Sequence, residues 1–420
     1  MGERHILHSD ADCFYASVET VLDPSLRGRA VAVCGSTQER HGIVLAKSYS
    51  AKRAGVKTGM TNAEARRVCP GLITVPPRFD CYARFSAYLR DIYSRYTDTV
   101  EPFGLDECWL DITALPRDPV QVAQEIRSAV RDELGLTVSI GVSFNKVFAK
   151  LGSDMNKPDG MTVITKENYR DKVWGLPCSD LLFCSRATAE KLSDIGVFTV
   201  GDIAALPPEV MRRCLGKNGL TLWSYASGLD GSPVIGESSA PDAKSVGHGA
   251  TCVSDIEDEP GARRVIYALS QSIGGRLREI GMCACGVHLT VKNNMLLSRG
   301  WQKRIAPTQS EGDIASAACE LLSVGYTWQL PVRALTVTAI GLVSEREPEQ
   351  TDMFCPVEDK LRRERLGRSI DMIRKRYGGG AIVPAVVLGD DKLPHDRGHD
   401  IFGEIFDPFG KGYRGRRDGV

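Results

Sequence analysis

The sequence predicts an α+β protein of several domains, the first of them built on a ferredoxin-like sheet. Its 420 residues are too many for one typical hydrophobic core, so about two to four domains are expected. In residues 4–170 the signals run β-α-insert-α-β-β-α-β-α, which is typical of a ferredoxin-like sheet backed by helices, with residues 26–77 inserted. Beyond residue 170, short helices separated by glycine turns are followed by a small α/β pattern.

The first elements follow from local signals. Residues 4–10 are expected to form a strand, and Asp12 is expected to cap a helix that Asp23 and Pro24 end. A short strand covers residues 30–34. Further helices are expected at residues 48–54, 61–68 and 80–96.

Residues 100–113 are expected to form a β-hairpin. After it, Asp118 and Pro119 provide an N-cap and a first-turn proline, and Gly135 ends the helix that they open. Its apolar stripe consists of Val122, Ile126, Val130 and Leu134. The next elements are a strand at residues 138–142 and a helix from about residue 145.

The second half of the chain has a different character. Residues 192–203 predict two short helices around a glycine turn, and residues 215–220 predict a second such turn. Residues 228–242 are rich in Gly, Ser and Pro, as linkers are. Residues 346–420 form a charged tail with one basic helix at 359–377 and a Gly/Arg-rich end that is expected to be disordered.

Composition excludes several classes of protein. The formal net charge is zero and the hydrophobic fraction is 42%. The N-terminus has no signal-peptide pattern and no stretch approaches the ~20 apolar residues of a membrane span, so a cytoplasmic protein without membrane contact is expected. Its 13 cysteines have scattered spacing with no CxxC pair, which favours buried thiols over a zinc site or disulfides.

Two acidic clusters carry the strongest chemical signal. The first follows an apolar strand as His8-Ser-Asp-Ala-Asp-Cys-Phe-Tyr15, and the second is Glu101-Pro-Phe-Gly-Leu-Asp-Glu-Cys-Trp-Leu-Asp111. Burying carboxylates costs several kcal/mol each unless a positive charge compensates them. Asp10, Asp106 and Glu107 are enough to hold a pair of Mg²⁺ ions about 4 Å apart, which points to phosphoryl transfer. Neighbours in an ideal strand face opposite sides, so Gly104 is expected to bend the hairpin. Taken one at a time, these could equally be ordinary turn carboxylates.

Three segments together resemble the Y-family DNA polymerases, and most of all the bacterial DNA polymerase IV (DinB-like) branch. They are Asp10-Ala-Asp-Cys-Phe-Tyr-Ala-Ser-Val-Glu19, the second acidic cluster, and Ser139-Ile-Gly-Val-Ser-Phe-Asn-Lys-Val-Phe-Ala-Lys150. The resemblance is collinear over residues 4–343. It implies a catalytic palm (1–25 and 78–170), fingers (26–77), a helix-hairpin-helix thumb (171–232), a linker (233–243), a little finger (244–345) and a C-terminal tail (346–420).

The resemblance also assigns residues to the site. Asp10, Asp106, Glu107 and the backbone carbonyl of Ala11 would hold two Mg²⁺ ions, for which Mn²⁺ can substitute. Phe14 and Tyr15 would line the nucleotide site, with Tyr15 as the steric gate against a ribose 2′-OH; its alternative is a core aromatic. The remaining nucleotide contacts would be Tyr49, Lys52 and Lys157. Lys52 stands where many relatives have arginine, so its grip on phosphate lacks the bidentate geometry.

Other positions match DNA and protein contacts of the family. Gly196 and Lys217 in the two glycine turns, and Lys244 at the start of the little finger, would contact DNA phosphates. Gln350-Thr-Asp-Met-Phe354 resembles a peptide that docks in the bacterial sliding clamp, with Gln350, Met353 and Phe354 as its anchors. Such a peptide would tether the enzyme near the primer end.

The implied function is template-directed DNA synthesis on a primer 3′-OH, of low fidelity and used in translesion synthesis and DNA damage tolerance. Its partners would be primer-template DNA, dNTPs and the sliding clamp, and the chain is expected to be a monomer. The small fingers insert leaves little material to close over a nascent base pair. Two alternatives stay open: a nucleotidyl cyclase-like enzyme on a similar palm, which needs no template, and a non-catalytic DNA-binding accessory of lesion bypass.

Overall fold

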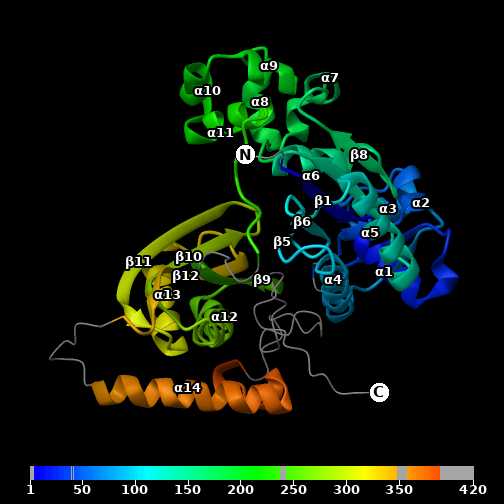
Figure 1. Ribbon diagram of the computed structural model, residues 1–420. Helices are drawn as coiled ribbons and strands as arrows, with labels where there is room; N and C mark the ends of the chain where they lie inside the picture. The colour runs from blue at the N-terminus through cyan, green and yellow to red at the C-terminus, as the bar shows by residue number, and fades with distance from the viewer. Residues whose placement is uncertain (1–3, 39, 41, 237–242, 348–356, 388–420) are drawn as a thin grey trace. The chain divides into compact units, whose positions relative to one another are not determined.

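The computed structural model describes residues 4–38, 40, 42–236, 243–347 and 357–387 (Figure 1). The chain divides into two compact units. The first contains the described residues up to Val33, Ala46–Lys57, and those from Val68 to residue 236; the second contains the remaining described residues. Each unit is described by itself. Within the described residues, no helix is long and apolar enough to span a bilayer, and the cysteines are free thiols.

The centre of the first unit is a five-stranded sheet with the order β5-β6-β1-β7-β8. The strands are β5 (Val100–Phe103), β6 (Glu107–Asp111), β1 (Ile6–Ala11), β7 (Val138–Ser143) and β8 (Met161–Ile164). Every residue of β1 is buried, and this strand pairs antiparallel with both β6 and β7. Only β7 and β8 pair in parallel within this sheet. The mixed sheet confirms the predicted α+β class.

The helices of this sheet domain are α1 (Phe14–Leu22), α4 (Phe79–Tyr93), α5 (Pro119–Leu134) and α6 (Lys146–Met155). The prediction for α5 is confirmed: the Asp118 side chain accepts from the Val120 N–H, and Gly135 ends the helix at φ +67°. Helix α6 packs directly on β7. The two backbones are so close that a Cβ at Gly141 would come 1.8 Å from the Ala149 carbonyl oxygen. This close approach brings the side chains of α6 over the end of β6.

The predicted helix cap at Asp12 is wrong. Cys13, in the left-handed region at φ +49°, occupies the N-cap position of α1, and no side chain caps the helix. The Asp12 side chain is buried instead and accepts hydrogen bonds from other segments. An aspartate just before a helix can either cap that helix or accept hydrogen bonds from other segments. The donors that decide between these roles are distant in the sequence, so the local pattern does not reveal them.

The inserted region contains β2 (Val31–Cys34), β3 (Val44–Lys47), α2 (Tyr49–Arg53), α3 (Asn62–Val68) and β4 (Ile73–Val75). Strand β2 pairs in parallel with β4, with Val31 opposite Ile73. Helix α2 begins at the N-cap Ser48, whose side chain accepts from the Ala51 N–H. Tyr49, half-buried, and Lys52, exposed, both belong to this short helix.

The helical region after β8 contains α7 (Tyr169–Val173), α8 (Arg186–Ser193), α9 (Val200–Ala205), α10 (Pro208–Leu215) and α11 (Lys217–Ala226). Both predicted glycine turns are confirmed, since Gly196 (φ +79°) separates α8 from α9 and Gly216 (φ +63°) separates α10 from α11. Thr199 and Asp202 form a capping box at α9.

The predicted linker begins with residues that pack on the five-stranded sheet. Val234 is 7% exposed and belongs to an apolar cluster with Ile6 and Trp109. The Ile235 N–H donates to Glu101 at 2.7 Å, and Lys146 also bonds to that carboxylate at 2.6 Å. Glu101 belongs to the second acidic cluster of the sequence. In the structure its carboxylate holds this segment and is not grouped with Asp10, Asp106 and Glu107.

The second unit contains a four-stranded antiparallel sheet with the order β11-β10-β12-β9. Its strands are β9 (Ser245–Ile256), β10 (Met282–Asn293), β11 (Ser298–Thr308) and β12 (Val332–Ser344). Helices α12 (Glu259–Glu279) and α13 (Glu311–Gly325) pack on the sheet and bury its apolar core (Figure 1). This is the small α/β domain that the sequence predicts.

A further helix, α14 (Val357–Tyr377), is attached to this domain along α12 (Figure 1). Arg278 of α12, whose side chain is 5% exposed, bonds to Asp371 of α14 at 2.5 Å and to Glu311 at 2.7 Å. Gly367 lies against the guanidinium, since a Cβ there would be 2.8 Å from Arg278 Nη1. The predicted basic helix is thus confirmed, and it is docked. The short helices η4 (Gly379–Ala381) and η5 (Ala385–Val387) follow it.

Candidate active site

Three carboxylates meet at one end of the five-stranded sheet. Asp10, near the end of β1, lies directly opposite Glu107, the first residue of β6. Asp106 precedes β6 in the hairpin turn, and its carbonyl accepts from the Ala11 N–H at 2.9 Å. Gly104 has φ +84°, which confirms the expected bend. Because only Glu107 belongs to the strand, strand alternation does not force Asp106 and Glu107 to opposite faces.

The electrostatics of these carboxylates show an excess of negative charge. Burial, together with the neighbouring Glu107 charge, raises the pKa of Asp10 to about 7 even though Lys157 opposes the shift. Burial and the Glu107 charge likewise raise the pKa of Asp106 to about 6. Without a further cation, the folded protein therefore disfavours the fully ionised set.

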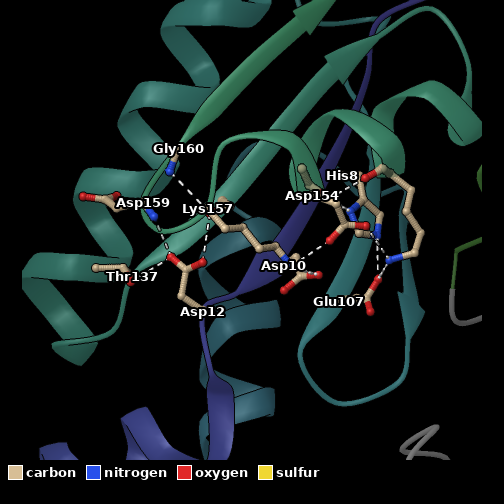
Figure 2. Close-up of polar contacts among 12 residues, drawn as sticks. His8, Asp10, Asp12, Glu107, Thr137, Asp154, Lys157, Asp159 and Gly160 are labelled. Atoms are coloured by element: carbon tan, nitrogen blue, oxygen red, sulfur yellow. Dashed lines mark hydrogen bonds and ion pairs between the residues drawn. The ribbon is translucent and has the colours of Figure 1, made fainter. Parts of the chain in front are cut away.

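Two lysines compensate part of this charge (Figure 2). Lys157 Nζ lies 2.6 Å from Asp10 Oδ2 and 2.8 Å from Asp154 Oδ1. Lys150, on α6, forms an ion pair with Glu107 and lies 3.7 Å from the other Asp154 oxygen. Burial alone would lower the pKa of Lys157, but the charge and hydrogen bond of Asp10 raise it above its usual value. Sequence analysis identified Lys157 but not Lys150 or Asp154.

His8 is a site residue that the sequence analysis missed. It is fully buried, with Nε2 3.2 Å from Glu107 Oε2 and Nδ1 2.8 Å from Ser153 Oγ. Burial lowers the pKa of His8 to about 4, so the ring is neutral at pH 7. Burial alone would raise the pKa of Glu107, but the His8 contact and the Lys150 charge lower it to about 2. The signal was available, because residues i and i+2 of a strand share a face and His8 precedes Asp10 by two.

The two predicted nucleotide-site aromatics lie in different environments. Phe14 is 3% exposed and packs in the core against Tyr82, with ring centroids 6.4 Å apart. Tyr15 is half-buried and stacks on Tyr82 at 4.2 Å, with Phe79 edge-on at 6.0 Å. Burial and the Asp106 charge raise the pKa of Tyr15 to about 12. The Tyr15 hydroxyl is therefore within electrostatic reach of the carboxylates, and Phe14 supports the ring from the core.

The predicted phosphate contacts are connected through Asp12. The Tyr49 hydroxyl donates to Asp12 Oδ1 at 3.1 Å, and the Asp159 N–H donates to Asp12 Oδ2 at 2.7 Å, two residues after Lys157. Lys52 is exposed on α2, with Nζ 5.6 Å from the Tyr49 ring centroid. Tyr49 and Lys157 thus lie on segments that are hydrogen-bonded to Asp12, the residue after β1, and Lys52 lies on the same helix as Tyr49.

The predicted DNA contacts are all in accessible positions. Gly196 lies in the turn between α8 and α9, Lys217 is the exposed first residue of α11, and Lys244 is exposed just before β9. The clamp-peptide residues Gln350, Met353 and Phe354 lie outside the described residues.

The carboxylate end of the sheet suits hard divalent cations. Within the described part of the chain, no three carboxylate, histidine or cysteine side chains are grouped so that they could hold one metal ion. Asp10 and Glu107 instead form ion pairs with Lys157 and Lys150. The donors are oxygens only, Asp10 is buried and Asp106 and Glu107 are half-buried, and burial together with the neighbouring Glu107 charge raises the pKa of Asp10 and of Asp106. Mg²⁺ prefers this chemistry and completes its coordination with water and substrate phosphates.

The chain matches known proteins over most of its length. Residues 9–154 match the model of the impB/mucB/samB family, and residues 243–353 match that of its C-terminal domain. DNA polymerase IV of Acetivibrio thermocellus is 44% identical over 395 residues, which cover 93% of this chain and 99% of the relative. The chain belongs to the DNA polymerase IV family.

Other members of the DNA polymerase IV family give the same result. The enzyme of Moorella thermoacetica is 38% identical over 91% of this chain and 96% of its own, and DNA polymerase IV 1 of Bacillus subtilis is 37% identical over 89% and 91%. A Y-family DNA polymerase chimera of known structure matches the fold with a TM-score of 0.72, at 23% identity, over 81% of this chain and 99% of its own. The chain is a DNA-directed DNA polymerase, and neither the cyclase nor the accessory alternative is favoured.

Proposed function

We propose that this chain adds deoxynucleotides to a primer 3′-OH by two-metal phosphoryl transfer, with low fidelity, during translesion synthesis. The observation that carries the proposal is the meeting of Asp10, Asp106 and Glu107 at one sheet end. There burial and mutual repulsion raise the pKa of Asp10 and of Asp106. Oxygen donors with surplus negative charge in a largely buried site favour the binding of divalent cations, which in turn coordinate a polyphosphate substrate.

In this proposal Asp10, Asp106, Glu107 and the Ala11 carbonyl hold two Mg²⁺ ions. When bound, the ions would activate the primer hydroxyl and stabilise the departing pyrophosphate. Lys157 forms an ion pair with Asp10 in the structure. When the ions and the nucleotide bind, its ammonium group would pair with a triphosphate oxygen instead. His8 and Ser153 hold the Glu107 carboxylate and the start of β6 in one orientation.

Substrate selection follows from the ring of Tyr15. Its face is stacked on Tyr82, with the ring centroids 4.2 Å apart, so it cannot turn away without losing this contact. A ribose 2′-OH would meet this fixed ring, whereas deoxyribose would not. The substrates are accordingly dNTPs on a primer-template.

The proposal extends to the setting of the enzyme. Residues 350–354 would bind the sliding clamp and so raise the effective concentration of the enzyme at primer ends. The enzyme would act as a monomer in the cytoplasm, where it reaches the chromosome.

The test is primer extension with a labelled primer-template, four dNTPs and Mg²⁺. Wild type is expected to extend the primer, and Asp106→Ala to lose roughly a thousandfold or more in rate while still binding the DNA. The control is Asp132→Asn, which removes an exposed carboxylate of α5 and should leave the rate unchanged. Full activity of Asp106→Ala, in a preparation free of other polymerases, would overturn the proposed site.

A further inference from the structure

Asp12 is a buried carboxylate that the proposed chemistry does not use. It is 2% exposed and receives four hydrogen bonds. Among the described residues, no lysine or arginine forms an ion pair with it. We infer that Asp12 is a positioning residue that sets the triphosphate site by fixing the segments of Tyr49 and Lys157 to the sheet. This inference rests on the proposed nucleotide roles of those two residues.

Each Asp12 oxygen accepts from one donor at β7 and from one donor on a separate segment, and Figure 2 shows the two bonds to Thr137 and to the Asp159 N–H. Oδ1 accepts from Ser139 Oγ of β7 at 2.9 Å and from the Tyr49 hydroxyl of α2 at 3.1 Å. Oδ2 accepts from Thr137 Oγ1, just before β7, at 2.8 Å and from the Asp159 N–H at 2.7 Å. The carboxylate thus links the sheet to two separate elements at once.

The turn that carries Lys157 is held in place from both sides. On one side its Asp159 N–H bonds to Asp12, and its Gly160 N–H donates to Ser139 Oγ at 3.3 Å. On the other side the Asp159 side chain forms ion pairs with Arg127, at 2.9 Å, and with Arg131, both on α5. Asp159 itself has φ +51°, so these contacts maintain a backbone geometry that few residues adopt freely. Lys157 consequently leaves the turn at a fixed point beside Asp10.

Tyr49 depends on the same carboxylate. Its hydroxyl is the only side-chain link that the structure shows between α2 and the Asp12 carboxylate within the described residues. Burial and the Asp12 charge raise the pKa of Tyr49, so the hydroxyl stays a proton donor. Removing the acceptor would take one hydrogen bond from α2 and one from the Lys157 turn at the same time, although neither Asp10 nor Glu107 would be touched.

Asp12→Asn provides the sharpest test, because the amide keeps the shape of the side chain but replaces one acceptor oxygen by a donor. Single-nucleotide insertion should show KM for dNTP raised about tenfold or more, the size of one lost hydrogen bond to a buried charge. The change in kcat and in Kd for primer-template should stay within about threefold. A residue that only supported the fold would lower the melting temperature and the active fraction without raising KM.

A matched pair of serines on β7 keeps the test decisive if Asp12→Asn does not fold. Ser139→Ala removes one bond to Asp12 and the Gly160 contact, and should raise KM for dNTP a few-fold. Ser143→Ala removes a buried hydroxyl of the same strand that donates to the Ile164 carbonyl and, among the described residues, does not bond to Asp12 or to the Lys157 turn, so it should leave KM unchanged. Equal KM values for Ser139→Ala and Ser143→Ala would overturn the inference.

Lys157→Ala separates this inference from the proposed function. If Lys157→Ala leaves KM for dNTP unchanged, the proposed nucleotide site is itself wrong. If Lys157→Ala raises KM and Asp12→Asn does not, the nucleotide site stands and the role of Asp12 is refuted.

Discussion

Lys157 Nζ lies 2.6 Å from Asp10 Oδ2, so a lysine from the turn after α6 pairs with the carboxylate at the end of β1. Asp10 is a proposed metal ligand and Lys157 a proposed phosphate contact. A bound cation would take over the compensation of Asp10 and release the ammonium for a phosphate oxygen. The ion pair therefore links metal loading to nucleotide binding through two side chains.

The pH dependence of stability provides a test of this charge arrangement. Asp10 has an ordinary pKa of 3.8 that the fold raises to about 7, so between these values the folded protein binds more protons than the unfolded chain. This group should make the stability of the metal-free protein fall as pH rises from 5 to 7, by at most about 1.4 kcal/mol per pH unit. The raised pKa of Asp106 and the lowered pKa of His8 contribute with opposite signs and largely cancel below about pH 6, so the Asp10 slope should remain visible. The measurement is thermal unfolding in EDTA at several pH values.

Asp10→Asn should flatten this pH profile, and Asp132→Asn should leave it as in wild type. Mg²⁺ should restore the stability of wild type most strongly above pH 7, where Asp10 is ionised. The same slope in Asp10→Asn and wild type would show that Asp10 is not the group responsible.

Sugar selection should depend on the Tyr15 ring. Tyr15→Ala removes the ring that stacks on Tyr82 at 4.2 Å and opens the space for a 2′-OH. The preference for dNTP over rNTP, measured as the ratio of kcat/KM values, should fall roughly 100-fold. Tyr15→Phe keeps the ring and should keep most of the preference. An unchanged ratio in Tyr15→Ala would place the gate elsewhere.

Metal affinity should depend on His8. His8→Phe preserves a ring against Trp109 but removes the 3.2 Å contact to Glu107. Loss of such an outer partner typically weakens metal binding about 10- to 100-fold, so titration of Mn²⁺ should show a weaker site with DNA affinity retained. Ser153→Ala, which removes the partner of the other ring nitrogen, should have a smaller effect in the same direction. Unchanged Mn²⁺ affinity in His8→Phe would leave the histidine a purely structural role.

The attachment of α14 should depend on Arg278. Arg278→Met leaves Asp371 and Glu311 without their cation, and should destabilise the second unit by about 3 kcal/mol. Arg263→Met removes an exposed pair with Glu259 on the same helix and should cost less than about 1 kcal/mol. Urea unfolding measures both, and limited proteolysis around α14 reports whether the helix has detached.

Sequence analysis performed best where the deciding signals were local. The hairpin before Asp111 and the helix between Asp118 and Gly135 are specified by turn residues, caps and periodicity within one segment. The three carboxylates were found because their motif and the resemblance to a family point to the same residues.

The remaining features depend on contacts between distant segments. Asp12 receives hydrogen bonds from Tyr49, Thr137 and Asp159, none of them near it in sequence, so its local context suggested a helix cap. The docking of Val234 on the sheet was hidden by the linker-like composition around it. Lys150 became visible only when the packing of α6 on β7 placed it beside Glu107.

The docking of α14 has a consequence for the proposed clamp contact. Residues 350–354 lie between β12, which ends at Ser344, and α14, which begins at Val357 and is fastened to α12. A protein bound at residues 350–354 would therefore be connected to the same domain on both sides of its binding peptide, through β12 before it and through α14 after it. If that protein is the proposed clamp, the few residues on either side would limit how far it can move from this domain, whereas a peptide in a free C-terminal tail would impose no such limit.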